Sequence, residues 1–332
     1  MTRGIIIGKF MPPHLGHKYM VDFACNYADE VLVLVCTRPE EPILGRLRYD
    51  WMRKMCPKAR VVQDTSDPPA YPEDHSDFWN IWKRLLQAHM NLTFGSSKVD
   101  FVFGSEDYCF KLAEMLGAKY IPVDKDRQLV PVSGTAIRNN PIANWEYIPE
   151  AVRSYYVKRV CVYGPESTGK TTLTKALALH FDTVYVEEYA RPLLDYKNGV
   201  CEYGDIEVIA RGHYASQQAM IANANGILFL DTDAVTTKVW SSVLFNKVPD
   251  VVNEVILKQE IDMYLLLDID VPWVDDKQRI HGTPEQRKMF FNLLKLELHE
   301  RKLPYVVISG DYTTRLVRSI EVVTALLNPI AK

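Results

Sequence analysis

A glycine-rich stretch in the middle of the chain, RVCVYGPESTGKTT over residues 159–172, constrains the fold more than any other segment. It satisfies the pattern G-x-x-x-x-G-K-[ST], with an apolar run before it and a helix-forming run after it. Such a P-loop turns its backbone N–H groups toward a phosphate tail at the N-terminus of the next helix. We therefore predict an ATP site in which Lys170 reaches the β- and γ-phosphates and the Thr171 hydroxyl holds Mg²⁺. The other residues predicted to bind this nucleotide are Gly164, Gly169 and Thr172.

Length and composition bound the class of protein. With 332 residues the chain is long for one domain and adequate for two. A net charge of −3 provides no overall basic field, so we expect neither nucleic acid nor a membrane surface as a partner. The six cysteines form no C-x-x-C pair, and the apolar runs are far shorter than the roughly 18 residues of a membrane span. These features predict a globular cytoplasmic protein with reduced thiols.

The first half alternates apolar strand patterns with helical patterns. Strands are predicted at residues 4–8, 31–36, 60–63, 100–103 and 119–123. This βαβ rhythm predicts a doubly wound parallel sheet with its ligand at the carboxyl ends of the strands. Asparagine and proline residues between 139 and 149 place the domain boundary near Lys158, which gives domains 1–157 and 158–332.

A histidine pair follows the first strand in the segment GKFMPPHLGH, residues 8–17. His14 and His17 are three residues apart at a predicted helix start, so both imidazoles can face one phosphate, and Gly16 lets that ligand approach the backbone. A pair of surface histidines and a metal site without a third ligand are the weaker interpretations. Gly8, Lys9 and Phe10 are predicted to contact the same nucleotide.

A second phosphate-binding pattern lies in PVSGTAIR, residues 131–138. Ser133 and Thr135 stand at a helix start, and Arg138 adds a guanidinium that can hold phosphate with two hydrogen bonds. An ordinary helix cap explains this pattern equally well when it is taken alone. Four further residues follow predicted strands, where the base and ribose of a nucleotide would lie: Gly104, Ser105, Asp124 and Arg127.

Three side chains of the first half are candidates for substrate contact. Arg48 follows the second predicted strand, and Trp79 and Trp82 follow a polar, proline-rich loop over residues 64–77. An aromatic ring can stack on a cationic base. The alternative for the two tryptophans, which are three residues apart, is the core face of a helix.

Together the H-x-G-H and S-x-T-x-x-R patterns resemble those of the nucleotidyltransferase superfamily, with Gly134 where many members have another small polar residue. The motif order, followed by a P-loop domain, resembles the NadR family of bifunctional enzymes. The resemblance implies a Rossmann-like nicotinamide mononucleotide (NMN) adenylyltransferase domain fused to a P-loop ribosylnicotinamide kinase domain, using ATP and Mg²⁺. Some enterobacterial members carry an N-terminal helix-turn-helix that represses transcription. This chain begins on the first strand, so we expect it to lack that domain and not to bind DNA.

In the second half, strands are predicted at residues 183–187, 227–230 and 264–267 and a helix at 284–301, and acidic residues follow the first two of these strands. The run 227–230 ends at Asp231, a pattern typical of a carboxylate that holds Mg²⁺, although a strand-end aspartate is also a common helix cap. The kinase reaction also needs a carboxylate base. Glu187 and Glu188 are candidates and Asp231 and Asp233 are rivals, which the sequence does not rank. Our assignment places Glu188 and Asp231 in catalysis and Asp233 at the substrate.

The segment after the predicted strand 264–267 resembles the lid of small nucleoside kinases. Lys277, Arg279 or Arg287 can close onto the transferred phosphoryl group, and Trp273 can stack on the nicotinamide ring. A solvated charged loop is the alternative. The expected ligands are the small molecules ribosylnicotinamide, NMN and ATP.

Two further interpretations of the function stay open on the sequence alone. They are the same chemistry on another nucleoside or a pantetheine-like substrate, and a regulator that senses NAD and ATP without significant catalysis. The sequence does not determine the oligomeric state, and a homo-oligomer is compatible with it.

Overall fold

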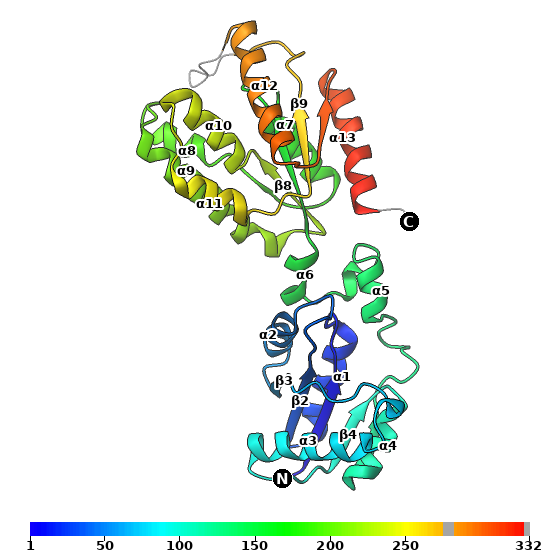
Figure 1. The fold of residues 1–332 in the computed structure, drawn as a ribbon. Coiled ribbons are helices and arrows are strands. Elements are labelled where there is room, and N and C mark those ends of the chain that lie inside the picture. Colours follow the sequence, from blue (N-terminus) through cyan, green and yellow to red (C-terminus); the bar gives the residue numbers. More distant parts are fainter. Residues whose placement is uncertain (275–281, 329–332) are drawn as a thin grey trace. The chain divides into compact units, whose positions relative to one another are not determined.

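The computed structural model describes residues 1–274 and 282–328. The chain divides into two compact units, Met1–Arg153 and Ser154–Lys332, here called the N-terminal and C-terminal units (Figure 1). Each unit is built on its own five-stranded parallel sheet. The predicted α/β class with two parallel sheets is therefore confirmed.

The sheet of the N-terminal unit has the order β3-β2-β1-β4-β5. Its strands are β1 (Arg3–Gly8), β2 (Glu30–Cys36), β3 (Arg60–Asp64), β4 (Phe101–Gly104) and β5 (Lys119–Pro122). Its helices are α1 (Leu15–Tyr27), α2 (Gly45–Met55), α3 (Phe78–Phe94), α4 (Tyr108–Leu116), α5 (Gly134–Asn139) and α6 (Glu150–Tyr156), the last running across the division between the units. Because the chain winds outward from β1 in both directions, the strand order reverses between β1 and β4. Ligands of such sheets bind in the crevice outside the carboxyl ends of the strands at this point.

The sheet of the C-terminal unit has the order β10-β9-β6-β8-β7. Its strands are β6 (Lys158–Tyr163), β7 (Tyr185–Val186), β8 (Ile227–Asp231), β9 (Met263–Leu267) and β10 (Tyr305–Ile308). Its helices are α7 (Lys170–His180), α8 (Ala190–Tyr196), α9 (Tyr203–Met220), α10 (Ala234–Phe245), α11 (Asp250–Lys258), α12 (Pro284–Glu300) and α13 (Tyr312–Leu327). The central strand β6 leads directly into the P-loop, so the phosphate site lies at the middle of the sheet edge.

Each sheet is covered by apolar side chains from its helices. In the N-terminal unit, Ile5 and Leu32 of the sheet pack with Leu86 and Met90 of α3, and all four are fully buried. In the C-terminal unit, residues of β6 and β8 pack with Leu177 of α7 and with α13. Burying one such side chain stabilises the fold by about 1.5–3 kcal/mol.

The edge strand β7 is shorter than the predicted strand 183–187. Thr183 forms hydrogen bonds to the neighbouring segment through its side-chain hydroxyl, and the backbone pairing with β8 begins at Tyr185. The Thr183 hydroxyl donates to the Ile227 carbonyl at 2.6 Å and accepts from the Asn225 N–H at 2.9 Å. The predicted helix 284–301 is observed as α12, with a capping box between Thr283 and Gln286.

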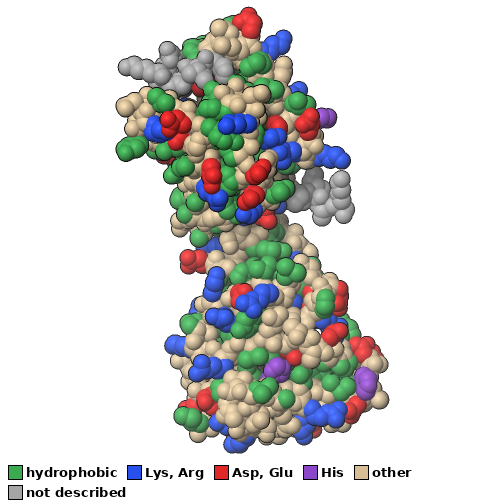
Figure 2. Space-filling view, turned by 60° about the vertical axis from the view of Figure 1, so that its left-hand side comes forward, with side chains coloured by type: hydrophobic (Ala, Val, Ile, Leu, Met, Phe, Trp, Pro, Cys, Tyr) green, Lys and Arg blue, Asp and Glu red, His purple; other side chains and the backbone are tan. Residues whose placement is uncertain are grey.

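Basic, acidic and hydrophobic side chains are scattered over the visible face of each unit (Figure 2). Among the described helices, none combines the length and apolar character needed to cross a bilayer.

Candidate active sites

The H-x-G-H motif forms the N-terminus of α1. The imidazole rings of His14 and His17 stack with their centroids 3.6 Å apart, and the backbone N–H of His14 donates to Nδ1 of His17 at 3.2 Å. A Cβ atom built on Gly16 would lie 3.0 Å from Nδ1 of His14, so glycine leaves room for this arrangement. Nδ1 of His14 is buried without a hydrogen-bond partner. The motif therefore holds an unsatisfied polar atom ready for a ligand.

The histidine pair is electrically neutral at neutral pH. Burial, together with the positive charge of Arg127, lowers the pKa of His14 to about 4. Burial and the neighbouring His14 hold the pKa of His17 well below its usual value. Each neutral ring has one N–H donor and one acceptor, and an arriving phosphate would favour the charged, doubly donating form.

The S-x-T-x-x-R motif forms the start of α5 and faces the histidine segment. Ser133 caps the helix by accepting from the Ala136 N–H at 3.1 Å. Arg138 donates to the Met11 carbonyl and, at 3.1 Å, to the Thr135 hydroxyl. A Cβ atom built on Gly134 would lie 2.5 Å from the Met11 carbonyl oxygen. The glycine at this position therefore permits close contact between the two motifs.

A cavity of about 360 Å³ joins the two motifs at the β1/β4 edge. The predicted nucleotide and catalytic residues that line it are Gly8, Lys9, Phe10, His14, His17, Gly104, Ser105, Arg127, Ser133, Thr135 and Arg138. Asp124 has a different task, because its carboxylate accepts from the backbone N–H groups of Leu129 and Val130 at 3.1 and 3.2 Å. It shapes the loop that carries Arg127.

A second cavity of about 640 Å³ lies beside the first and shares Gly8 and Lys9 with it. Trp79 and Trp82 of α3 line this cavity, and Nε1 of Trp82 donates to the Pro69 carbonyl at 3.1 Å. Both tryptophans are half-buried. The structure thus places them beside the phosphate cavity with their rings at a wall where a planar base can lie.

Arg48 requires a correction, because its side chain has no exposed surface. Its guanidinium donates to the backbone carbonyls of Lys9 at 2.5 Å and Cys36 at 3.3 Å and to the Glu41 carboxylate, while Nε donates to the Ile43 carbonyl at 3.0 Å. Arg48 therefore does not contact substrate. It fixes the backbone of Lys9, which lines both cavities.

The P-loop of the C-terminal unit wraps in the expected way. Gly164 and Gly169 have φ values of 151° and 84°, which side chains larger than hydrogen rarely adopt. Nζ of Lys170 donates to the Pro165 carbonyl at 2.8 Å within the loop.

Arg315, a fully buried arginine on α13, holds the P-loop in place through hydrogen bonds. It donates to the carbonyls of Thr168 at 2.6 Å, Gly310 at 2.8 Å and Asp268 at 2.9 Å, and it pairs with the Asp270 carboxylate. The P-loop is therefore held by a helix far away in the sequence, a feature that motif reading did not detect.

Thr171 and Asp231 meet at the end of β8. The Thr171 hydroxyl donates to Oδ2 of Asp231 at 2.5 Å, and Oδ1 of Asp231 is buried without a partner. Burial and the nearby Glu188 raise the pKa of Asp231 to about 6. A hydroxyl and an unsatisfied carboxylate oxygen fit Mg²⁺, which takes few protein ligands and completes its shell with water and phosphate oxygens. Within residues 1–274 and 282–328, no cluster of three or more His, Cys, Asp or Glu residues could hold a metal ion.

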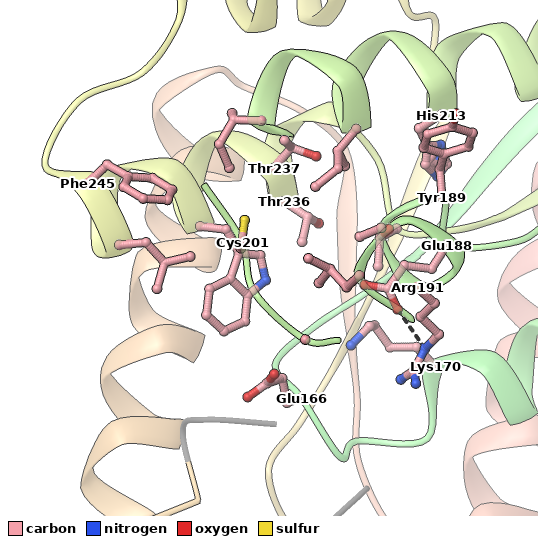
Figure 3. Close-up of a pocket in the computed structure, with 18 of the residues that line it drawn as sticks. Glu166, Lys170, Glu188, Tyr189, Arg191, Cys201, His213, Thr236, Thr237 and Phe245 are labelled. Carbon is pink, nitrogen blue, oxygen red and sulfur yellow. Dashed lines mark hydrogen bonds and ion pairs between the residues drawn. The ribbon is translucent and has the colours of Figure 1, made fainter. Parts of the chain in front are cut away.

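A cavity of about 360 Å³ extends from the P-loop between α8, α9 and α10. Lys170, Glu188 and Arg191 lie at one end of it and Phe245 at the other (Figure 3). Nε of Arg191 pairs with the Glu188 carboxylate at 3.1 Å. Glu187 is different, because its side chain is 71% exposed and lies 3.6 Å from Lys175. The two adjacent glutamates therefore have distinct surroundings, and only Glu188 lines the cavity.

Asp233 also requires a correction. It is buried and caps α10 by accepting from the N–H groups of Val235 and Thr236, each at 3.1 Å. Its other oxygen accepts from Nε2 of Gln259 and from the Tyr264 hydroxyl, each at 2.6 Å. Asp233 is thus a helix cap with a full set of partners and does not contact substrate.

The predicted lid is described in part. Lys277 and Arg279 lie outside the described residues. Trp273 lies near the guanidinium of Arg287, 5.9 Å from ring centroid to Cζ, and Arg287 is buried and donates to the Val271 carbonyl at 3.1 Å. The aromatic side chains at the described cavity are instead Tyr189, Trp240 and Phe245, which sequence reasoning did not single out. Trp240 and Phe245 lie on α10, after Asp233, in a stretch whose sequence resembles an ordinary helical core pattern.

Two phosphate sites, each at the carboxyl edge of its own parallel sheet, define a nucleotide-handling protein in which a Rossmann-like nucleotidyltransferase unit precedes a P-loop kinase unit. A family model described as an AAA domain matches residues 159–315. The chain is 30% identical to the trifunctional NAD biosynthesis/regulator protein NadR of Escherichia coli (strain K12), over 98% of this chain and 83% of the relative. The chain therefore belongs to the NadR family, as its motif order predicted.

Two crystal structures of NadR proteins share this fold at 24% sequence identity. One, in complex with NAD and AMP-PNP, matches with a TM-score of 0.80 and covers 100% of this chain and 98% of that chain. The other, in complex with NR, matches with a TM-score of 0.82 and covers 99% and 97%. Each unit thus has a known fold.

Proposed function

We propose that the chain is a bifunctional NAD salvage enzyme. The C-terminal unit phosphorylates the 5′-hydroxyl of ribosylnicotinamide with ATP, and the N-terminal unit joins NMN to the AMP part of a second ATP, giving NAD and pyrophosphate. The observation that carries the proposal is the presence of two separate phosphate cavities in one chain of the NadR family. The complexes of related structures with NR, NAD and AMP-PNP support it.

In the kinase step, the residues divide between the phosphates and the acceptor hydroxyl. Lys170 binds the β- and γ-phosphates, and Thr171 and Asp231 would hold Mg²⁺, which would supply positive charge to the phosphoryl group in transfer. Glu188 accepts the proton of the 5′-hydroxyl as its oxygen attacks the γ-phosphorus and the bond to the β-phosphate oxygen breaks. Glu188 suits this task because it lines the cavity, whereas Glu187 points to Lys175 and Asp233 is saturated with partners.

In the adenylyltransferase step, the site positions two phosphates and neutralises their charge. An oxygen of the NMN phosphate attacks the α-phosphorus of ATP, the bond to the β-phosphate breaks, and pyrophosphate leaves without a covalent enzyme intermediate. His14, His17 and Arg138 donate to the phosphate oxygens, and this positioning can supply several kcal/mol of the rate enhancement, on the order of 7–11 kcal/mol in well-oriented systems. The neighbouring cavity with Trp79 and Trp82 accepts the nicotinamide ring.

A direct assay tests both reactions. Purified protein is incubated with ATP, Mg²⁺ and either ribosylnicotinamide or NMN, and NMN, NAD and pyrophosphate are followed by chromatography. Parallel reactions with uridine and with pantetheine test other acceptors. We expect NMN from ribosylnicotinamide and NAD from NMN. Folded protein that forms neither product contradicts the proposal, and preference for another acceptor contradicts the substrate assignment.

Two substitutions test the division of labour. Lys170→Ala removes the phosphate contact of the P-loop and is expected to abolish NMN formation while NAD formation from added NMN continues. His17→Ala is expected to do the reverse. Each variant serves as the folding control for the other, so loss of both activities in either one argues against independent sites.

A further inference from the structure

One helix of the C-terminal unit, α9, touches the kinase site through two consecutive residues. Gly212 lies against the ring of Tyr189, the residue that follows Glu188. His213 contacts the backbone of Asp231. Tyr189 and His213 lie at the same end of the cavity as Glu188 (Figure 3). The helix thus reaches both segments that carry the carboxylates of the site.

The contact between Gly212 and Tyr189 leaves no space for a side chain. A Cβ atom built on Gly212 would lie 2.2, 2.4 and 2.5 Å from three atoms of the Tyr189 ring. Carbon atoms in ordinary contact are about 3.5–4 Å apart, so an alanine here would displace the ring by roughly 1 Å. Since Tyr189 stands between Glu188 and α8, we expect this displacement to shift the segment that carries the Glu188 carboxylate and its partner Arg191.

The contact between His213 and Asp231 fixes the backbone at the end of β8. Nε2 of His213 lies 3.2 Å from the Asp231 carbonyl oxygen, and both residues are buried. Burial lowers the pKa of His213 to about 4, so the ring is neutral and its Nε2–H donates to the carbonyl.

The next residue, Thr232, has a φ of 68°, a left-handed conformation that is uncommon for threonine. On the other side of this turn, the Thr232 N–H donates to the Val162 carbonyl at 3.2 Å. The turn that directs Asp231 toward Thr171 is therefore held between β6 and α9.

We infer that Gly212 and His213 are positioning residues of the kinase site, which together set the separation between Glu188 and Asp231. This inference rests on the proposed kinase function. The separation matters because two carboxylates repel each other more strongly as they approach, while a hydroxyl and Mg²⁺-bound phosphate must both fit between them. One rigid helix that contacts both segments keeps this separation constant.

Gly212→Ala tests the first contact, with Gly204→Ala as a matched control on the same helix, where an added Cβ atom meets nothing within 4 Å. We expect kcat for ribosylnicotinamide phosphorylation to fall about 100-fold in Gly212→Ala, as for a roughly 1 Å misplacement, with KM for ATP within twofold of the wild-type value. Gly204→Ala is expected to keep wild-type kinase kinetics. NAD formation from NMN, measured on the same samples, is expected to stay unchanged in both variants. Equal kcat in Gly212→Ala and Gly204→Ala overturns the inference.

The double variant Tyr189→Ala/Gly212→Ala separates positioning from unfolding. Without the ring, the alanine at 212 has space, so we expect the double variant to match Tyr189→Ala in kcat and in AMP-PNP binding. This holds even if Gly212→Ala alone fails to bind AMP-PNP through misfolding. If kcat of the double variant is lower than that of Tyr189→Ala by the factor seen in Gly212→Ala alone, Gly212 does not act through Tyr189.

His213→Gln and His213→Leu test the second contact. The amide nitrogen of Gln can replace the Nε2–H donor, whereas Leu fills space without donating. We expect His213→Gln to keep kcat within about threefold and His213→Leu to lose about tenfold, the size of one hydrogen bond of about 1.4 kcal/mol. Equal loss in both variants assigns His213 to packing alone and overturns its positioning role. Wild-type protein that forms no NMN refutes the proposed function instead, so the two failures are distinguishable.

Discussion

The burial of Asp233 leads to a prediction about stability that separates a structural role from a substrate contact. Its carboxylate caps α10 through two N–H groups and accepts from Gln259 and Tyr264 at 2.6 Å each. Asp233→Ala removes these four bonds, together with a longer one from the Thr236 hydroxyl at 3.4 Å, and leaves buried donors without partners. Loss of an N-cap costs about 1 kcal/mol. Each bond to a charged group contributes about 1.5–3 kcal/mol.

Because the four bonds share one carboxylate, their energies do not add fully, and we expect a loss of about 4 kcal/mol. The C-terminal unit spans Ser154–Lys332, and for a unit of this size each kcal/mol shifts the unfolding temperature by about 2–4 °C. The transition of this unit should therefore fall by about 8–16 °C. The N-terminal unit should unfold at its wild-type temperature.

Scanning calorimetry of the full chain measures both transitions, and ribosylnicotinamide, which the proposal places in the C-terminal unit alone, identifies the C-terminal transition by raising it. Asp311→Ala is the matched control, since Asp311 caps α13 through the Thr314 N–H at 2.8 Å but is exposed. It should cost only about 1 kcal/mol. If the two variants unfold alike while KM for ribosylnicotinamide rises tenfold in Asp233→Ala, Asp233 contacts substrate and the structural assignment fails.

Two predictions concern the N-terminal unit. Gly134→Ala places a Cβ atom 2.5 Å from the Met11 carbonyl oxygen, so adenylyltransferase kcat should fall about 100-fold while kinase activity stays unchanged. A chromatographic assay of NAD formation measures this rate. An unchanged rate would show that the H-x-G-H and S-x-T-x-x-R segments need not be in close contact. Burial of His14 affects stability below neutral pH, because the unfolded state takes up a proton near the ordinary histidine pKa of 6.5, whereas the folded state stays unprotonated until about pH 4. The lowered pKa therefore costs nothing above pH 6.5 and about 2 kcal/mol at pH 5. Calorimetry should show that, between pH 7.5 and pH 5, the unfolding temperature of the N-terminal unit falls less in His14→Asn than in the wild type. An identical pH dependence of this temperature in the two proteins would contradict the burial of a neutral His14.

Both sheets, and the positions of the phosphate motifs along them, could be predicted from the sequence because they depend on local patterns. Apolar runs such as the one before Gly164 specify buried parallel strands. The spacing of Gly164, Gly169 and Lys170 specifies a phosphate-binding loop without reference to distant parts of the chain. The strand that was overestimated, β7, is an edge strand whose neighbouring residue Thr183 bonds through its hydroxyl.

Arg48 and Asp233 could not be assigned correctly because a charged residue near a strand end has two possible sets of partners. It can face a ligand, or it can satisfy backbone and side-chain groups of its own chain, as both residues do. Residue order does not distinguish these outcomes, since the partners come from elements far away in sequence. The close contact at Gly212 depends in the same way on Tyr189, which lies on the preceding segment.

The contacts of Arg315 have a consequence for protein synthesis. The N-terminal unit is complete once residue 153 has left the ribosome, and domains generally fold in the order in which they emerge. The P-loop emerges soon afterwards, but the arginine that holds its Thr168 carbonyl belongs to α13, which is translated only after β10, the last strand of this sheet in chain order. A nascent chain can therefore acquire its first nucleotide site well before its second, and ribosome-bound chains stopped ahead of α13 should bind NMN and ATP in the first site while their P-loop lacks its support.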